Sequence, residues 1–236
     1  MSQTGTQPAP AGSAARLRLK LGLVLGDVVN ARDRLLNHPR VADLYPEYLF
    51  FTHCIIRASV PVMRCARDRA LSIGVSDPVA AGLAAYLDEH IAEEMHHDDW
   101  VLDDLDVVGG DREALLARAP SPTVASLVGA QYYWILHHDP VAVMGYIALL
   151  EGYPPSTALI DRLIDRTGHP PEAFRTLLAH GALDEHHRLE FDRALDALPL
   201  SPAHETIIGL SAMHSTHTFA RALAEVIDGA GLGRGG

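Results

Sequence analysis

Histidines and carboxylates cluster in three stretches of this sequence, and their spacing predicts a metal site. In the first stretch, residues 90–97 (HIAEEMHH), Glu93 and His96 are three residues apart and share one face of a helix. A carboxylate and an imidazole on one face can bind one metal ion. Glu89, seven residues before His96, shares that face. A solvated, charged helix surface is the alternative interpretation of this stretch.

The second stretch carries three potential ligands within two helical turns. His180, Asp184 and His187 occupy positions i, i+4 and i+7. On a helix they fall within roughly 60° of one another, in a single stripe. The alternative interpretation is a surface stripe or a buried, hydrogen-bonded cluster.

The third element is a single carboxylate at the end of an apolar run. Glu151 follows residues 141–150 (VAVMGYIALL). An ionised carboxylate on such a helix is costly to bury unless it is paired or bound to a metal. Gly152 follows directly, so a side chain that reaches solvent at a helix end is the alternative.

Together the three stretches supply three histidines and three carboxylates: Glu93, His96, Glu151, His180, Asp184 and His187. Nitrogen and oxygen donors without thiolate suit iron or manganese, and also zinc. Helical bundles build dinuclear carboxylate sites from inward-facing side chains of this kind. A dinuclear iron site built in this way can bind and reduce O2.

The elements that must position these residues are all helical, because apolar residues recur every three or four positions and no alternating strand pattern is present. We expect an all-α fold of about eight helices in one domain, residues 15–228, between flexible tails at 1–14 and 229–236. Prolines, glycines and capping residues bound the expected helices, which are 15–37, 46–72 with a kink at Pro61, 77–108, 123–138, a segment ending at Glu151, 156–166, 171–198 and 202–227.

Three motifs carry a resemblance to a known family: H-x3-D-x2-H at residues 180–187, EE-x-H followed by tryptophan at 93–100, and L-E-G at 150–152. Over about residues 40–220 the sequence resembles the heme-oxygenase-like diiron oxidases and oxygenases, also called iron-containing redox enzymes. The resemblance implies a heme-oxygenase-like bundle in which the six residues named above hold two non-heme iron ions, with O2 as the co-substrate. It also implies a small-molecule substrate, such as an amino acid, a fatty acid or a biosynthetic intermediate, and a homodimer. Most members bind no heme.

One region departs from the family pattern. Several members take a carboxylate from the first core helix, but residues 54–60 here (CIIRASV) contain none. Glu89 or Glu93 would then supply that ligand. Loose binding of the second metal, which the resemblance implies, is compatible with the gap.

Composition excludes several other classes of protein. A net charge of −11 and a single lysine, Lys20, disfavour binding to nucleic acid and to heme propionates. Two cysteines, Cys54 and Cys65, cannot form a disulfide framework, so we expect a reducing, cytoplasmic environment. We find no uncharged apolar run of transmembrane length, no signal peptide and no P-loop, H-E-x-x-H or G-x-S-x-G motif, so no membrane partner is expected.

Three rival functions remain open at this point: a ferritin-like di-iron protein, which would not need His180, a cofactor-free enzyme of the same fold, and a non-catalytic metal- or ligand-binding protein. Arg57 could bind a substrate carboxylate or form a structural salt bridge, and Tyr146 could donate to a metal-bound oxygen species or pack in the core. His214 and His217 could line a substrate pocket, bind metal, or have a packing or surface role.

Overall fold

The computed structural model describes residues 12–229, except for the side chains of residues 183–185. Within this part of the chain every regular element is a helix, which confirms the expected all-α class. The predicted tails at 1–14 and 229–236 fall mostly outside the described residues. The first helix already begins at Ser13, within the segment expected to be a tail.

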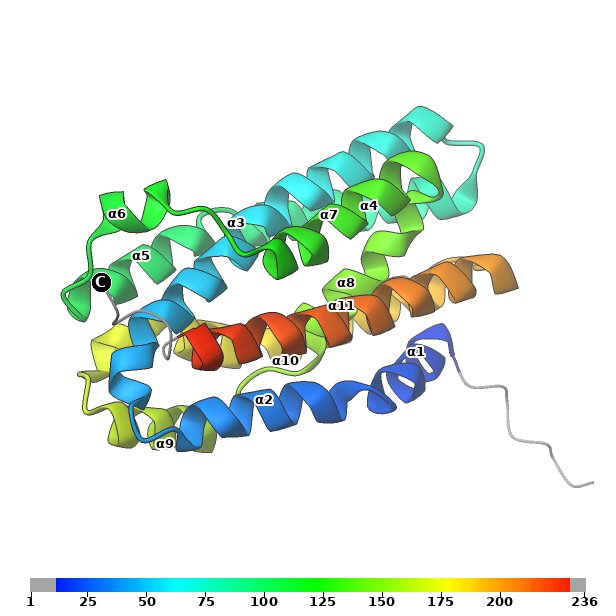
Figure 1. Cartoon of the computed structure of the whole chain (residues 1–236). Coiled ribbons are helices and arrows are strands. Elements are labelled where there is room, and N and C mark those ends of the chain that lie inside the picture. Colours follow the sequence, from blue (N-terminus) through cyan, green and yellow to red (C-terminus); the bar gives the residue numbers. More distant parts are fainter. Residues whose placement is uncertain (1–11, 230–236) are drawn as a thin grey trace, which may run out of the picture.

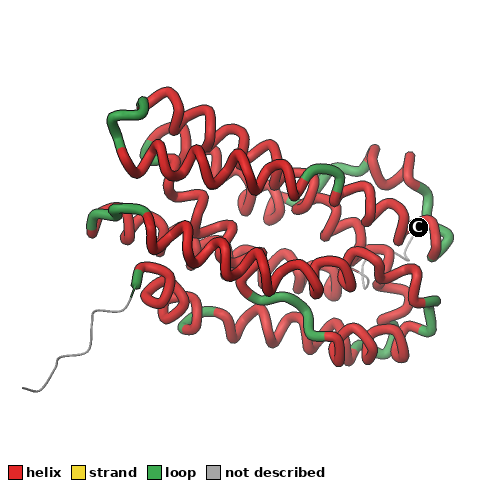
Figure 2. Tube along the Cα trace, turned by 180° about the vertical axis from the view of Figure 1, so that it is seen from behind, coloured by secondary structure: helices red, strands yellow, loops and turns green. Residues whose placement is uncertain are grey.

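The helices have the following bounds: α1 Ser13–Gly22, α2 Leu25–Asn37, α3 Val41–Ile73, α4 Pro78–Glu94, α5 His97–Val107, α6 Arg112–Ala117, α7 Pro122–His137, η1 Pro140–Ala142, α8 Val143–Gly152, α9 Thr157–Thr167, η2 Pro171–Phe174, α10 Arg175–Ala197 and α11 Pro202–Gly229. Figures 1 and 2 show two groups of elongated helices. One contains α3, α4 and α7, and the other contains α2, α10 and α11. Helix α8 runs between the groups and packs against α11 (Figure 1).

Capping residues explain why many of these helices start where they do. The carboxylate of Asp77 accepts hydrogen bonds from the backbone N–H groups of Val79 and Ala80, with Pro78 at the first helical position of α4. Ser121 caps α7 and Ser156 caps α9 in the same way. Local capping chemistry thus sets the starts of these helices.

Two predicted helices are each divided into two. The segment expected to be one helix over 15–37 is broken at residues 23–24, between α1 and α2. The segment expected over 77–108 is broken at residues 95–96, between α4 and α5. At the second break His96 has a φ of 71°, in the left-handed region that a helix interior does not contain. This break changes which side chains face inward.

Helix α3 is longer than expected. It begins at Val41 rather than at Pro46 and continues through Pro61 for 33 residues in all. Within the described residues, α3 is also the one helix long and apolar enough to span a membrane by length and composition. Half of its most apolar window is buried inside the protein, as in the core helix of a soluble domain.

Close packing of α8 against α11 depends on a glycine. A Cβ atom on Gly145 would collide with the backbone of Ile208 and Ala212 on α11. Only glycine therefore allows the two backbones to approach this closely. The approach buries nearly all of α8, and it brings Glu151 into the interior.

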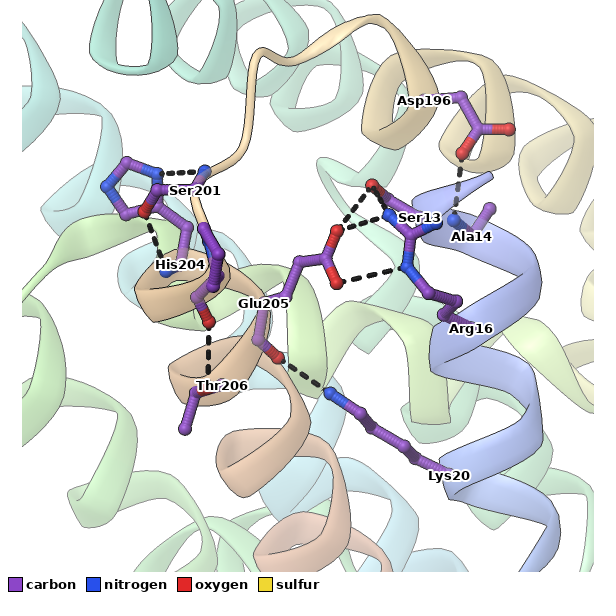
Figure 3. A network of polar contacts seen from close by, with 10 residues as sticks. Ser13, Ala14, Arg16, Lys20, Asp196, Ser201, His204, Glu205 and Thr206 are labelled. Atoms are coloured by element: carbon purple, nitrogen blue, oxygen red, sulfur yellow. Dashed lines mark hydrogen bonds and ion pairs between the residues drawn. The ribbon is translucent and has the colours of Figure 1, made fainter. Parts of the chain in front are cut away.

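Helix α1 is held to the end of the bundle by the polar network in Figure 3. The carboxylate of Asp196 accepts a hydrogen bond from the backbone N–H of Ala14, at 2.8 Å. The guanidinium of Arg16 pairs with Glu205, and the ammonium of Lys20 donates to the backbone carbonyl of Glu205. These contacts tie α1 to both α10 and α11.

Candidate metal centre

Histidine and carboxylate side chains from four helices converge in the interior. They are His90 and Glu94 from α4, His97 from α5, Glu151 from α8, and His180 and His187 from α10. Two groups within this cluster are close enough to hold a metal ion. The first is Glu94, His97 and His180, and the second is His90, Glu94 and Glu151. In each group the potential ligand atoms lie within 4.8 Å of one another, and Glu94 belongs to both.

The first group pairs one carboxylate with two imidazoles. Nδ1 of His97 lies 3.1 Å from Oε2 of Glu94, and the rings of His97 and His180 meet edge to face with centroids 5.1 Å apart. Nδ1 of His180 donates to the backbone carbonyl of Thr176 at 2.8 Å. This hydrogen bond leaves the lone pair of Nε2 free to bind a metal. Burial lowers the pKa of His180, which favours the neutral ring that a ligand requires.

The second group contains a tight imidazole–carboxylate pair. Nε2 of His90 lies 2.5 Å from Oε1 of Glu151. Desolvation lowers the pKa of His90, but its hydrogen bond with Glu151 and the surrounding carboxylates outweigh this effect and raise the pKa to about 9. The other carboxylate oxygen, Oε2 of Glu151, is buried without a hydrogen-bond partner. A buried carboxylate with an unused acceptor is expensive unless a cation binds it, so these residues fit a metal ion.

Glu94 connects the two groups. Burial raises the pKa of its carboxyl, but the hydrogen bond with His97 and the charges of His180 and His90 outweigh it, so the pKa is lowered. Its carboxylate is therefore ionised at neutral pH and lies within ligand distance of both groups. A carboxylate in this position can bridge two metal ions.

His187 borders the cluster, and only 4% of its side chain is exposed. Its Nε2 lies 3.7 Å from Oε2 of Glu93, and its Nδ1 lies 3.7 Å from Oε1 of Glu94. Its ring meets that of His90 edge to face. His187 is thus positioned to supply a further nitrogen ligand to a metal ion, although it belongs to neither compact group.

The structure brings some of the predicted ligands together and not others. Glu151 and His180 belong to the compact groups, and His187 lies beside them. The side chain of Asp184 lies outside the described residues. His96 is 80% exposed and pairs with Asp99 at the surface, so it points away from the cluster.

The structure places Glu94 and His97 in the compact groups, where the sequence predicted Glu93 and His96. The physical reason is the break at residues 95–96, because the periodicity argument assumed an unbroken helix there. The side chain of Glu93 is 43% exposed, and its carboxylate lies 3.6 Å from His90 and 3.7 Å from His187. Glu89, the alternative ligand, is exposed.

Sequence reasoning missed three residues of the site: His90, Glu94 and His97. A signal for Glu94 was present, because the buried face of α4 contains Leu83, Leu87 and Ile91, and Glu94 continues that spacing of three and four. His90 is adjacent to Ile91 and lies on the same buried side. Among the described residues, neither group contains a carboxylate from α3.

The four residues left open by the sequence lie outside both groups. Tyr146 is buried and Ser59 lies beside its ring, and burial raises the pKa of Tyr146. Arg57 is half-buried on α3 near His53. His214 packs edge to face against Trp134. His217 is exposed, with Asp27 nearby at 3.8 Å.

Residues 69–217 match the model of a family described as iron-containing redox enzymes. No curated protein matches the chain in sequence. The matched segment contains all the residues of both compact groups.

Solved structures resemble this chain in fold at low sequence identity. A domain of unknown function with a heme oxygenase-like fold, from Shewanella denitrificans OS217, is 19% identical with a TM-score of 0.79, over 92% of this chain and 93% of that one. A TenA homolog from Pseudomonas syringae pv. tomato DC3000 is 14% identical with a TM-score of 0.70, over 97% and 99%. A CADD-like protein of unknown function from Nostoc punctiforme PCC 73102 is 16% identical with a TM-score of 0.67, over 92% and 98%. These likenesses establish the heme-oxygenase-like fold.

Proposed function

The chain belongs to the family of iron-containing redox enzymes, and we propose that it is a non-heme diiron oxidase or oxygenase that uses O2 to oxidise a small molecule. The observation that carries the proposal is that Glu94 belongs to two adjacent ligand groups. One group alone would suit a single ion. Two groups with a common carboxylate suit a pair of ions at short distance.

Two bound Fe(II) ions would supply the electrons that reduce O2 and so overcome its slow reaction with ordinary organic molecules. Their ligands would be His97, His180 and Glu94 on one side, and Glu151, His90 and Glu94 on the other. For His90 to bind a metal it must lose the proton that it shares with Glu151. His187 and Asp184 complete the donor set that we propose.

The protein itself contributes orientation and exclusion of water. The backbone carbonyl of Thr176 fixes the ring of His180, so that Nε2 faces the cluster. The ring of Trp100 stacks on His97 with centroids 3.9 Å apart and limits its rotation. On α8, Ile147 and Leu149 are almost fully buried near Glu151 and keep solvent from this side of the site.

The main rivals are a cofactor-free enzyme of this fold and a protein that binds metal without catalysis. Fold likeness alone does not separate them from the proposed enzyme, because a fold hosts unrelated functions. The buried ligands with an unused carboxylate oxygen favour a metal centre over a cofactor-free site. A ferritin-like di-iron protein would not need His180, whereas here His180 lies inside a compact group.

The decisive experiment is anaerobic loading with Fe(II), followed by exposure to O2. We expect about two iron ions per chain for the native protein by Mössbauer spectroscopy and metal analysis, and a transient visible absorbance in stopped flow. Glu94→Ala should lose both ions, because its carboxylate serves both groups. The matched control is Glu89→Ala, on the same helix and exposed, which should keep most of the iron.

Three outcomes would contradict the proposal. They are full iron loading of Glu94→Ala, activity that survives complete chelation, and the absence of O2 consumption with every substrate tested. The same loading of His180→Ala separates the proposal from the ferritin-like alternative. We expect reduced iron binding in this variant, and unchanged stoichiometry would favour the rival.

A further inference from the structure

Beside the ligand cluster lies a cavity of about 470 Å³ whose ligand the proposed function does not identify. Its volume is in the range of cavities that hold small molecules. Glu94, Glu151 and His180 form one part of its wall, and apolar side chains from α2, α3, α8 and α11 form most of the rest. In a mainly apolar wall, the few polar groups fix the orientation of a ligand.

The hydroxyl of Tyr146, on α8, is a polar group of this wall that makes no hydrogen bond. Tyr146 lines the cavity and is 1% exposed, and its hydroxyl is buried. Ser59 on α3 lines the cavity beside Tyr146 but lies outside hydrogen-bond distance of that hydroxyl. The hydroxyl of Ser59 donates instead to the backbone carbonyl of Ile55, at 3.3 Å. A buried donor without an acceptor is costly, and an acceptor on a bound ligand would remove that cost.

Three other polar atoms of the described wall are buried without a hydrogen bond, and each has a charge or a charged neighbour. Oε2 of Glu151 belongs to a carboxylate of the ligand cluster. Oγ1 of Thr176 lies beside the carboxylate of Asp104. Nε of Arg32 carries part of a positive charge and lies 3.7 Å from a carboxylate. Of these four buried atoms, the hydroxyl of Tyr146 is therefore the neutral donor without a charged neighbour.

Tyr146 lies at a defined distance from the ligand cluster. Glu151 follows Tyr146 by five residues on the same helix, a rise of roughly 7.5 Å, and both residues line the cavity. An extended carbon chain advances by roughly 1.2 Å per bond, one third of the length of an extended residue. An acceptor that binds Tyr146 is thus roughly six bonds from a ligand atom that lies at the cluster.

The rest of the cavity extends away from the cluster along α3. Met95, the residue after Glu94, contacts the guanidinium of Arg64, at 3.6 Å from Sδ to Nη2. The end of α4 is therefore level with this part of α3. The residues of α3 that line the cavity run from Met63 back to Tyr48, over a rise of roughly 22 Å. The cavity thus has room for an apolar tail that points toward Tyr48.

The acceptor that suits Tyr146 is neutral. Arg32 is the only arginine or lysine that lines the cavity among the described residues, and it lies near Tyr48, at the far end. An anion beside Tyr146 would be buried without either side chain to pair with, which is costly. A carbonyl oxygen only accepts hydrogen bonds, whereas a ligand hydroxyl brings a hydrogen that needs an acceptor of its own.

We propose that the cavity binds a neutral carbonyl compound, a ketone, ester or amide, whose oxygen accepts a hydrogen bond from Tyr146. One carbon chain of the ligand reaches the cluster of Glu94, Glu151 and His180, and the other lies along α3. Tyr146 then determines which carbon atom lies at the cluster, roughly six bonds from the oxygen. The inference rests on the proposed function for the reaction, but binding is measured without it.

A matched pair of ligands tests the proposal. The probes are dihexyl ketone and the alkene in which a CH2 group replaces its oxygen, and equilibrium dialysis against the full-length chain gives both affinities. Because the alkene is the more hydrophobic ligand, the quantity compared is the ratio of ketone affinity to alkene affinity in the native chain and in Tyr146→Phe. We expect the variant to lower this ratio roughly tenfold, since only the ketone loses a donor.

The carbonyl stretching band of the bound ketone reports the hydrogen bond directly. With an isotope label at the carbonyl carbon, infrared spectroscopy should show a lower wavenumber in the native chain than in hexane. The band should return to the hexane value in Tyr146→Phe. The matched control is Tyr48→Phe, the same substitution at the far end of the cavity, which should leave both the band and the affinity ratio unchanged.

Thermal unfolding verifies that the variants are folded. Tyr146→Phe should be at least as stable as the native chain, because it removes a buried hydroxyl that makes no hydrogen bond. Failure of the ketone to bind, an affinity ratio that Tyr146→Phe does not change, or a bound carbonyl band at its hexane position would each overturn the proposal.

The outcomes also distinguish this inference from the proposed function. A preference for the ketone that depends on Tyr146, in a chain that neither binds iron nor consumes O2, would support the ligand class and reject the diiron function. Iron loading and O2 consumption, with an affinity ratio that Tyr146→Phe does not change, would do the reverse.

Discussion

Glu151 at the end of α8 and Asp104 in α5 are the two carboxylates that are buried among the described side chains, and their surroundings differ. Oδ1 and Oδ2 of Asp104 accept hydrogen bonds from the backbone N–H groups of Arg175 and Thr176, each at 3.0 Å. Glu151 has one oxygen paired with His90 and the other without a hydrogen-bond partner. Burial raises the pKa of both carboxyls, that of Asp104 to about 6.

The difference separates a structural carboxylate from a metal-competent one. Asp104 satisfies the first N–H groups of α10, which have no partner within their own helix, and so fixes α10 against α5. Its oxygens are fully used. Glu151 has one carboxylate oxygen without a hydrogen-bond partner, and it lies among other potential metal ligands. A carboxylate that is to bind a cation needs both features. Burial and a raised pKa alone would not have distinguished the two.

The largest effect that we expect from this contrast is on metal binding by Glu151→Gln. The amide keeps the shape but loses the negative charge, so the group that contains His90 should bind its ion at least roughly a hundredfold more weakly. Iron stoichiometry should fall from about two to about one per chain by anaerobic titration. Asp104→Asn serves as the control and should keep both ions. Equal iron loss in the two variants would remove the distinction.

The next effect concerns stability and belongs to Asp104. Asp104→Ala leaves two backbone N–H groups buried without acceptors, which should lower the free energy of unfolding by about 2 to 3 kcal/mol. Urea denaturation of the metal-free chain measures this difference. Glu151→Gln cannot serve as the control here, because it breaks the buried pair with His90 and should itself lower the unfolding free energy by about 3 to 5 kcal/mol. An unfolding free energy of Asp104→Ala within about 1 kcal/mol of the native value would show that Asp104 does not fix α10 against α5.

Asp104 also predicts a pH dependence of stability. Its pKa is about 6 in the folded chain, above the ordinary value of 3.8, so the folded state holds a proton that the unfolded state releases near pH 4. Stability from this group is therefore fully present below about pH 4 and is lost as the pH rises through about 6, by roughly 3 kcal/mol.

Carboxyls whose pKa is lowered in the folded chain, such as Glu205, stabilise the protein more as the pH rises. The contribution of Asp104 is therefore measured as the difference in stability between the native chain and a variant. Urea denaturation of the native chain and of Asp104→Asn should diverge between pH 4 and 6. The variant should lack the loss of stability attributed to Asp104. Parallel curves across this window would show that Asp104 titrates normally.

The contrast between Glu151 and Asp104 also shows which features of the fold and the site could be predicted from the sequence. The all-α class was predictable because apolar spacing, prolines and caps act locally. Glu151 was predictable as a site residue because one carboxylate ends an otherwise apolar run. Asp104 was not, because its partners are backbone N–H groups more than seventy residues away that any residue type would provide. The pair Glu94 and His97 was missed because one left-handed residue, His96, shifts the inward face.

The smallest expected effect concerns the histidines on either side of that shift. His96→Ala should leave iron binding and stability unchanged, because this side chain is largely exposed and its pair with Asp99 lies at the surface. His97→Ala removes a buried ring 3.1 Å from Glu94 and should lose the ion of the first group. Metal analysis of the two variants compares adjacent residues of identical type. If His96→Ala loses iron and His97→Ala does not, the break between α4 and α5 is misplaced, and the ligand pair returns to Glu93 and His96.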